Sequence, residues 1–254
     1  MLNIKSFRKI ELKEMEKVKL MNRTDRKFWF HLKDVQPILD TVIDDYLLLT
    51  IDGKSLLPYA TSYFDTKNNE MFSNHHNGKL NRYKIRKRSY VDSGISFLEI
   101  KFKNNKGRTI KKRIPIAENN IEFNTEQDLF LQSMAPYKSD ELKFSLLNNF
   151  TRITLVNKNF KERCTIDLNL HFEFEERRVN LNNMVIVEIK SDGNSGFSPL
   201  AIALRNHRIK TSGFSKYCIG RTIIDFKLKR NAFKAKIRSI EKMLDSNHKL
   251  YLTT

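Results

Sequence analysis

The sequence predicts an α+β fold in which an antiparallel sheet of about eight strands closes into a barrel with a cationic interior and helices packed outside. Three observations support this prediction. Segments that alternate polar and apolar residues recur along the chain. Several are joined by pieces too short for a helical crossover, such as DSG at 92–94. Segments with helical spacing of apolar residues fill the gaps.

The alternating segments define the predicted strands, and the remaining periodic segments define the predicted helices. Strands are expected at 23–31, 46–52, 61–66, 82–91, 96–103, 109–116, 151–156, 163–175 and 184–190. Helices are expected at 33–45, in two stretches after Thr125 separated near Pro136, at 199–208 behind Pro199, and at 231–246. No linker or repeat divides the chain, so we expect one domain over 1–254, with a core of 20–225.

The predicted strand at 163–175 shows most clearly how the two faces of the sheet differ. Its odd positions from Arg163 to Glu175 are polar, and its even positions from Cys164 to Phe174 are apolar. Side chains alternate between the two faces of a strand, so this strand has one polar and one apolar face. A single strand of this kind would suit a solvated sheet surface.

Cations recur on the polar faces of several other predicted strands. They are Arg82, Lys84, Arg86 and Arg88 in one strand, Lys101 and Lys103 in the next, and Lys111, Arg113, Lys27 and Lys190 in others. Like charges side by side repel unless they face water or surround a polyanion. If the sheet closes with these faces inward, the interior is suited to a linear polyphosphate or a nucleoside triphosphate.

Composition favours a polyanionic partner and an intracellular location. Lys and Arg total 47 against 29 acidic residues, which gives a formal net charge of +18. Two cysteines are too few for a disulfide framework, and no apolar run approaches the roughly 20 residues of a membrane span. We expect a cytoplasmic protein, held near a membrane only through a membrane-protein partner. The sequence predicts no particular oligomeric state.

Two glutamates lie among the cations and are candidate metal ligands. Oxygen ligands suit Mg²⁺ or Mn²⁺, which usually takes one or two carboxylates together with phosphate oxygens. The candidates are Glu188 and Glu99. The alternative is that each forms an ion pair with the lysine two positions along its strand, Lys190 or Lys101.

Several motifs together resemble a known family. They are RTDRKF, YFDT, HHNGKLNRYKIRKRSY, FLEIK, KKR, ERCTID, VEIK and SGFSKY, in this order. The set is similar to the catalytic domain of the vacuolar transporter chaperone complex. These domains are polyphosphate polymerases of the triphosphate tunnel metalloenzyme, or CYTH, superfamily. The resemblance covers roughly residues 20–225 and is specific as a set.

The resemblance implies a function and assigns roles to residues. It implies transfer of the γ-phosphate of ATP to a growing inorganic polyphosphate chain with the help of Mn²⁺, or alternatively Mg²⁺. The matching motifs imply phosphate binding by Lys27, Arg86, Arg88, Lys101, Lys111, Arg152, Arg163 and Lys216, with Ser215 beside them, and metal binding by Glu188. Arg82, Lys84, Arg113 and Lys190 are added as substrate-binding residues from the cationic faces.

Two departures from the family pattern affect these expectations. The superfamily often carries an ExExK strand, whereas this chain alternates Arg23, Asp25 and Lys27, which fits the polymerase branch rather than a simple triphosphatase. Phe150 stands where the family favours a tyrosine two residues before Arg152, so one phosphate-contacting hydroxyl is missing.

Other functions remain open at this stage. The same tunnel would serve a hydrolase of tripolyphosphate or nucleoside triphosphate, and a non-catalytic polyphosphate-binding module is a third reading. Nucleic acid is not the expected partner, because the residues interleaved with the cations, such as Leu98, Ile100 and Phe102, lie on the opposite face.

For three further residues a simpler role is favoured over metal binding or base stacking. For the adjacent His75 and His76, a loop position or a phosphate contact is favoured over metal binding, because neighbours in a strand point to opposite faces. Trp29 shares the Lys27 face, where packing is favoured over stacking on adenine.

Overall fold

The computed structural model describes residues 2–18, 23–117, 120–192 and 198–244, excluding the side chains of Lys17 and Arg23. The chain forms two compact units, each built from three separate segments. Unit 1 comprises Met1–Leu57, Phe150–Leu170 and Leu181–Phe214, and unit 2 comprises Pro58–Asn149, His171–Asn180 and Ser215–Thr254. The expectation of a single domain stays a prediction.

Eleven strands form one mixed, largely antiparallel sheet. They are β1 (Arg8–Glu11), β2 (Arg23–His31), β3 (Tyr46–Thr50), β4 (Leu57–Thr66), β5 (Arg82–Tyr90), β6 (Ile95–Lys103), β7 (Thr109–Ile116), β8 (Leu142–Asn157), β9 (Glu162–Phe174), β10 (Arg177–Leu181) and β11 (Met184–Asp192). The main order is β2-β11-β9-β8-β4-β5-β6-β7; β10 pairs with β9, and β3 pairs with β8 and, in parallel, with β1. Among the described strands no pairing joins β2 to β7, so the predicted closure into a barrel is not confirmed.

The helices confirm the α+β class. They are α1 (Val35–Asp40), α2 (Glu70–His76), α3 (Thr125–Met134), α4 (Pro199–Asn206), α5 (Lys216–Ile224) and α6 (Lys234–Met243). Short 3₁₀ helices are η1 (Leu12–Lys17), η2 (Leu32–Asp34), η3 (Val91–Ser93), η4 (Ser139–Glu141) and η6 (Asn231–Phe233).

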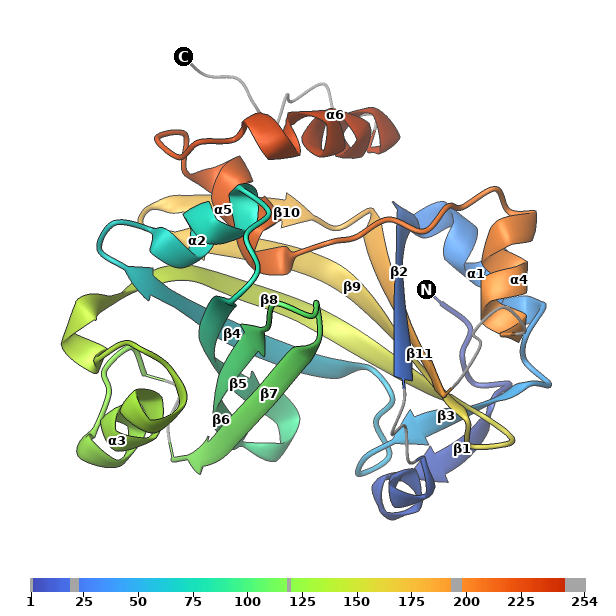
Figure 1. The fold of residues 1–254 in the computed structure, drawn as a ribbon. Helices are drawn as coiled ribbons and strands as arrows, with labels where there is room; N and C mark the ends of the chain where they lie inside the picture. The colour runs from blue at the N-terminus through green and yellow to red at the C-terminus, as the bar shows by residue number, and fades with distance from the viewer. Residues whose placement is uncertain (1, 19–22, 118–119, 193–197, 245–254) are drawn as a thin grey trace. The chain divides into compact units, whose positions relative to one another are not determined.

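In unit 1 the helices cover the apolar faces of the strands. Figure 1 shows α1 beside α4. Both helices contribute buried side chains, such as Ile38 and Leu204, to one core cluster with Phe28 of β2, Ile166 of β9 and Val187 of β11. The positions between these apolar residues therefore lie on the opposite, polar face.

Unit 2 has a corresponding core under a different set of strands. Ile85 of β5 and Leu98 of β6 are completely buried, and they cluster with Met71 of α2 and Leu131 of α3. Asn124 caps α3 by accepting a hydrogen bond from the backbone of Gln127 at 2.9 Å. Helices thus cover the apolar face of the strands in this unit as well.

Several predicted elements differ from the observed ones. The stretch after Pro136 was predicted to be a second helix, but it holds only η4 and then the first half of β8. This prediction was wrong because pairing in the sheet outweighs the local helical spacing of this segment. The helix predicted at 33–45 ends at Asp40 and continues as hydrogen-bonded turns. In the helix predicted at 231–246, residues 245 and 246 lie outside the described part of the chain.

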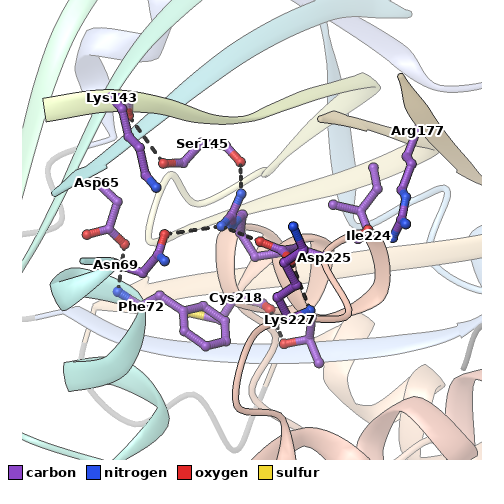
Figure 2. Close-up of polar contacts among 12 residues, drawn as sticks. Asp65, Asn69, Phe72, Lys143, Ser145, Arg177, Cys218, Ile224, Asp225 and Lys227 are labelled. Carbon is purple, nitrogen blue, oxygen red and sulfur yellow. Dashed lines mark hydrogen bonds and ion pairs between the residues drawn. The ribbon is translucent and has the colours of Figure 1, made fainter. Parts of the chain in front are cut away.

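Helix α5 of unit 2 was not predicted, and buried polar contacts hold it in place. Arg221 is only 1% exposed. Its guanidinium donates to the carbonyl of Ser145 at 2.8 Å, to Asn69 Oδ1 at 3.1 Å and to Asp225 Oδ2 at 2.8 Å. Figure 2 labels these three acceptor residues. The guanidinium also lies over the ring of Phe174, 4.2 Å from the centroid.

The same helix packs against the sheet through a glycine. A Cβ atom on Gly220 would lie 2.5 Å from Phe172 Cδ1 and 2.7 Å from Leu146 Cδ2. Any larger residue there requires one of these buried side chains to move. The position of α5, and of the residues at its N-terminus, therefore depends on a close approach at this point.

Candidate functional site

Cross-strand register in unit 1 gathers the predicted residues of three strands on one polar face. Lys27 of β2 lies opposite Glu188 of β11, which lies opposite Thr165 of β9. In the next row, Lys190 lies between Asp25 and Arg163. Lys27, Arg163, Glu188 and Lys190 are therefore neighbours on the polar face, which strand alternation predicted, in a register that it did not predict.

Glu188 is held between two lysines, and its side chain remains partly exposed to solvent. Its Oε1 accepts a hydrogen bond from Lys27 Nζ, and its Oε2 accepts one from Lys190 Nζ at 2.5 Å. Burial alone would raise the pKa of Glu188, but the charges of Lys190 and Lys27 hold it well below its ordinary range. The carboxylate is therefore ionised, and its side chain is 19% exposed.

Arg152 of β8 has a partner that the sequence analysis did not name. Its Nε and Nη2 donate to the two carboxylate oxygens of Asp167, at 2.6 and 2.9 Å. Asp167 is a polar-face residue of β9, so the alternation of 163–175 could have indicated it. The bidentate pair fixes the plane of the guanidinium. The ring of Phe150 lies under the same guanidinium, with the centroid 5.2 Å away.

Unit 2 carries its own cationic face on β5, β6 and β7. One cross-strand row consists of Lys84, Lys101 and Lys111, and the next consists of Arg86, Glu99 and Arg113. Three lysines in one row repel one another unless an anion or a carboxylate offsets them. This face thus has the charge pattern that phosphate oxygens match.

Glu99 is the carboxylate of this face, and it is almost completely enclosed. Arg86 donates to Glu99 Oε2 through Nε at 2.7 Å and through Nη2 at 2.5 Å, and Lys111 Nζ donates to Oε1 at 3.1 Å. Burial would raise the pKa of Glu99, but the charges of Arg86, Arg88 and Lys111 hold it below its ordinary range. The Glu99 side chain is 1% exposed.

The other predicted residues of unit 2 lie around this face. Arg88 donates through Nε to Thr61 Oγ1 at 3.1 Å and lies over the ring of Tyr59. Lys84 Nζ donates to Ser215 Oγ at 3.0 Å. Ser215 caps α5 by accepting a hydrogen bond from the backbone of Cys218, and Lys216 is the first residue of that helix. The cap directs the N-terminus of α5 toward Lys84.

The structure also decides between some of the alternatives. Glu188 does pair with Lys190, two residues along its strand, in addition to Lys27. The ion pairs of Glu99 run across the strands, to Arg86 and Lys111. His75 and His76 lie in the last turn of α2, so the argument from strand alternation was wrong for them.

A divalent metal fits the unit 1 face only together with its substrate. The described residues contain no group of three or more His, Cys, Asp or Glu that could hold a metal ion. Glu188 supplies one carboxylate. Thr165, opposite it in register, has a buried Oγ1 without a hydrogen-bond partner among the described residues. One carboxylate and one hydroxyl are hard oxygen donors that suit Mg²⁺ or Mn²⁺ when phosphate and water complete the shell.

Comparison with known protein families shows to which family the chain belongs. The sequence matches the profile of the VTC domain over residues 22–224. The chain belongs to the VTC domain family. The resemblance drawn from the motifs is thus confirmed. No curated protein significantly matches the sequence of this VTC domain.

Solved structures extend the comparison. The VTC domain is similar to a Hippeastrum protein named as an adenylyl cyclase and described as having a dominant triphosphatase activity, with a TM-score of 0.50, 14% identity, and coverage of 78% of this chain and 96% of that one. Proteins named as adenylate cyclases from Bacillus halodurans and Vibrio parahaemolyticus match with TM-scores of 0.48 and 0.45, each at 10% identity. They cover 77% and 76% of this chain and 96% and 94% of theirs. At such identities the Hippeastrum likeness concerns the fold alone.

No helix in the described part of the VTC domain has the length and hydropathy needed to cross a membrane. The phosphate-binding and metal-binding roles of the individual residues remain predictions.

Proposed function

We propose that this VTC domain is a polyphosphate polymerase that transfers the γ-phosphate of ATP to the end of a growing inorganic polyphosphate chain. A terminal oxygen of the chain forms the new bond to the γ-phosphorus, the bond to the β,γ-bridging oxygen breaks, and ADP leaves. Phosphoryl transfer needs mainly positioning and stabilisation of charge, so no covalent nucleophile from the protein is required.

The observation that carries the proposal is the accessible, ionised Glu188 between two lysines. A pure anion receptor gains nothing from a carboxylate, because it would repel phosphate. A metal enzyme needs one, and Glu188 with Thr165 would hold Mn²⁺ or Mg²⁺. When bound, the metal would supply charge neutralisation of phosphate oxygens.

The lysines of unit 1 have a defined part in this proposal. Lys27 and Lys190 donate hydrogen bonds to Glu188. Phosphate oxygens offer them stronger acceptors, since charge-assisted hydrogen bonds to phosphate match an ammonium well. The two side chains therefore turn from the carboxylate to the substrate, which leaves Glu188 oxygens available to the metal.

The cations of unit 2 are proposed to bind phosphates as well. Arg86 keeps a fixed orientation through Glu99, and Lys84, Lys101 and Lys111 present ammonium groups in one row. A guanidinium held by a buried carboxylate loses little conformational freedom when it binds an oxyanion. Glu99 is then a positioning residue for Arg86 and not a metal ligand.

A second function in the same class is supported by one comparison. The Hippeastrum protein of similar fold is described as a triphosphatase. If water replaces the polyphosphate end as acceptor, the same residues would hydrolyse tripolyphosphate or nucleoside triphosphate. The polymerase is preferred because the family resemblance runs through a specific set of motifs in this chain.

The test is to incubate the purified protein with ATP and Mn²⁺, with and without a short polyphosphate primer, and to separate the products on a gel. We expect chain growth with ADP release, reduced roughly 100-fold in Glu188→Gln, as a loss of several kcal/mol of charge stabilisation would produce. Glu173→Gln is the matched control, because Glu173 is a partly exposed strand glutamate paired with His171 and Arg178.

Two other results would overturn the polymerase. Free phosphate without chains would indicate the hydrolase. Tight binding of polyphosphate without turnover would indicate the binding module. Equal activity in Glu188→Gln and Glu173→Gln would remove Glu188 from the site.

A further inference from the structure

The C-terminal segment of unit 2 packs on the last turn of α2. The backbone N–H of Ala232 donates to His76 Nε2 at 3.2 Å. The ring of Phe233 lies 5.4 Å from the ring of His76, 6.2 Å from that of His75 and 6.0 Å from that of Phe72. This segment follows residue 224, where the VTC domain match ends. Residues outside the matched region therefore lie against α2.

This packing brings a lysine of α6 toward the same place. Lys236 follows Phe233 by three residues, so the two side chains lie on one side of the helix. Ile237 and Ile240 are completely buried, which fixes the rotation of α6. Lys236 is half-buried, and burial lowers the pKa of its ammonium group. The lysine is thus held near His75 and is not on the solvated side of the helix.

Cations of the sheet reach the same histidine. Arg82 of β5 and Lys103 of β6 are neighbours in register, one row beyond Lys84 and Lys101. Burial, followed by the charges of Lys84, Arg82, Lys103 and Lys236, lowers the pKa of His75 to about 2. Four cations from three elements therefore surround a neutral imidazole.

The imidazole itself has an unused polar atom. His75 Nδ1 is buried and has no hydrogen-bond partner among the described residues. A buried ring nitrogen without a partner is costly, and so is a group of like charges in a half-buried place. A phosphate oxygen would relieve both, because it accepts from ammonium, guanidinium and imidazole N–H groups.

We infer that His75, Arg82, Lys103 and Lys236 form an additional phosphate subsite, at the α2 and α6 end of the unit 2 face, which binds a further segment of the polyphosphate chain. The inference rests on the proposed function. Lys84 connects the two sites, because it donates to Ser215 and lies in the row next to Arg82. The subsite therefore selects chains longer than a triphosphate.

The chemistry of the pocket favours inorganic phosphate over nucleic acid. Single-stranded nucleic acid binds where aromatic rings offer their faces to bases. The aromatic ring at this position, Phe233, is already packed against Phe72, His75 and His76. The polar groups at this position are the four cations and one ring nitrogen, which are groups that bind phosphate oxygens.

The test compares binding of tripolyphosphate and of a long polyphosphate chain by fluorescence competition. In the double variant Lys103→Met and Lys236→Met, we expect the dissociation constant for the long chain to rise about tenfold and that for tripolyphosphate to stay unchanged. The control is Arg238→Met with Lys242→Met, which also removes two charges and lies on the exposed side of α6.

A second measurement does not depend on these variants. The ring ¹⁵N resonances of His75 should shift on adding the long chain and should not shift with tripolyphosphate. Unchanged long-chain affinity in the Lys103 and Lys236 variant, an equal loss in the control, or no shift at His75 would overturn the subsite. Failure of the proposed function would be seen in a different measurement, because no polyphosphate would form from ATP. The binding comparison between the long chain and tripolyphosphate does not depend on that result.

Discussion

Glu188 of unit 1 and Glu99 of unit 2 are alike in sequence and different in structure. Each is a glutamate on a cationic strand face, and each contacts two cations. Glu99 accepts two hydrogen bonds from one guanidinium and is 1% exposed, whereas Glu188 lies between two flexible ammonium groups and is 19% exposed. An arginine fork encloses a carboxylate, and lysines leave it exchangeable. The comparison teaches that the type of cation beside a carboxylate decides whether the carboxylate is enclosed in the structure or stays accessible.

The largest expected effect is the loss of stability when Glu99 is replaced. Glu99→Gln leaves the guanidinium of Arg86 buried without a counter-charge, so we expect the free energy of unfolding to fall by about 3–5 kcal/mol. Glu188→Gln should cost only about 1 kcal/mol, because its partners are partly exposed to water. Urea titrations of the two variants measure both values, and equal losses would contradict the distinction.

A second prediction compares two buried cations of strand β5, Lys87 and Arg86. Lys87 follows Arg86 but lies on the apolar face, where it is fully buried, donates to the carbonyl of Glu122, and lies 4.4 Å from the centroid of Phe123. Burial lowers its pKa from 10.5 to about 8, an effect that the charge of Glu122 opposes. Unlike Arg86, it is a buried cation that loses its charge at moderately alkaline pH.

The sign of the pH effect follows from this difference. Between about pH 8 and pH 10.5 the unfolded chain binds more protons than the folded one at Lys87, so the free energy of unfolding rises with pH, by roughly 2–3 kcal/mol in total. Lys87→Met should abolish this rise, while Lys112→Met on an exposed strand position keeps it. Urea titrations across this pH range test it, and parallel curves for the wild type and Lys87→Met would refute it.

The smallest expected effect concerns metal affinity. Lys27→Met removes one competitor for Glu188 and should tighten Mn²⁺ binding by about 1 kcal/mol, roughly fivefold. Lys111→Met removes the matching cation at Glu99 and should give no gain, because Arg86 still encloses that carboxylate. Electron paramagnetic resonance of free Mn²⁺, without nucleotide, measures both. A gain in Lys111→Met as large as in Lys27→Met would show that the arginine does not protect Glu99.

The polar faces were predictable because strand alternation is a local property. The period of two placed Lys27, Glu188 and Arg163 on polar faces without any knowledge of the sheet. The same parity would have placed Lys87 on the apolar face with Ile85. Local capping chemistry likewise predicted α4 behind Pro199.

The partners of these residues depend on register, which is not local. Glu99 meets Arg86, 13 positions earlier, only because β5 and β6 pair with Arg86 opposite Glu99. The sequence suggested its neighbour Lys101 instead. Closure of a sheet depends on strand tilt and shear, so alternation alone could not decide it. Helix α5 was missed because its β-branched residues Thr222, Ile223 and Ile224 weaken the helical signal.

The close approach at Gly220 allows substitutions in the core of unit 2 to shift helix α5 and the residues at its N-terminus. The helix is short and rigid, and it carries Ser215 and Lys216 at one end and the close contact with Phe172 and Leu146 near the other. An added methyl group at position 220 would displace the helix unless residue 172 or 146 became smaller. These three positions should therefore vary together among related chains, because together they set the position of Ser215 and Lys216.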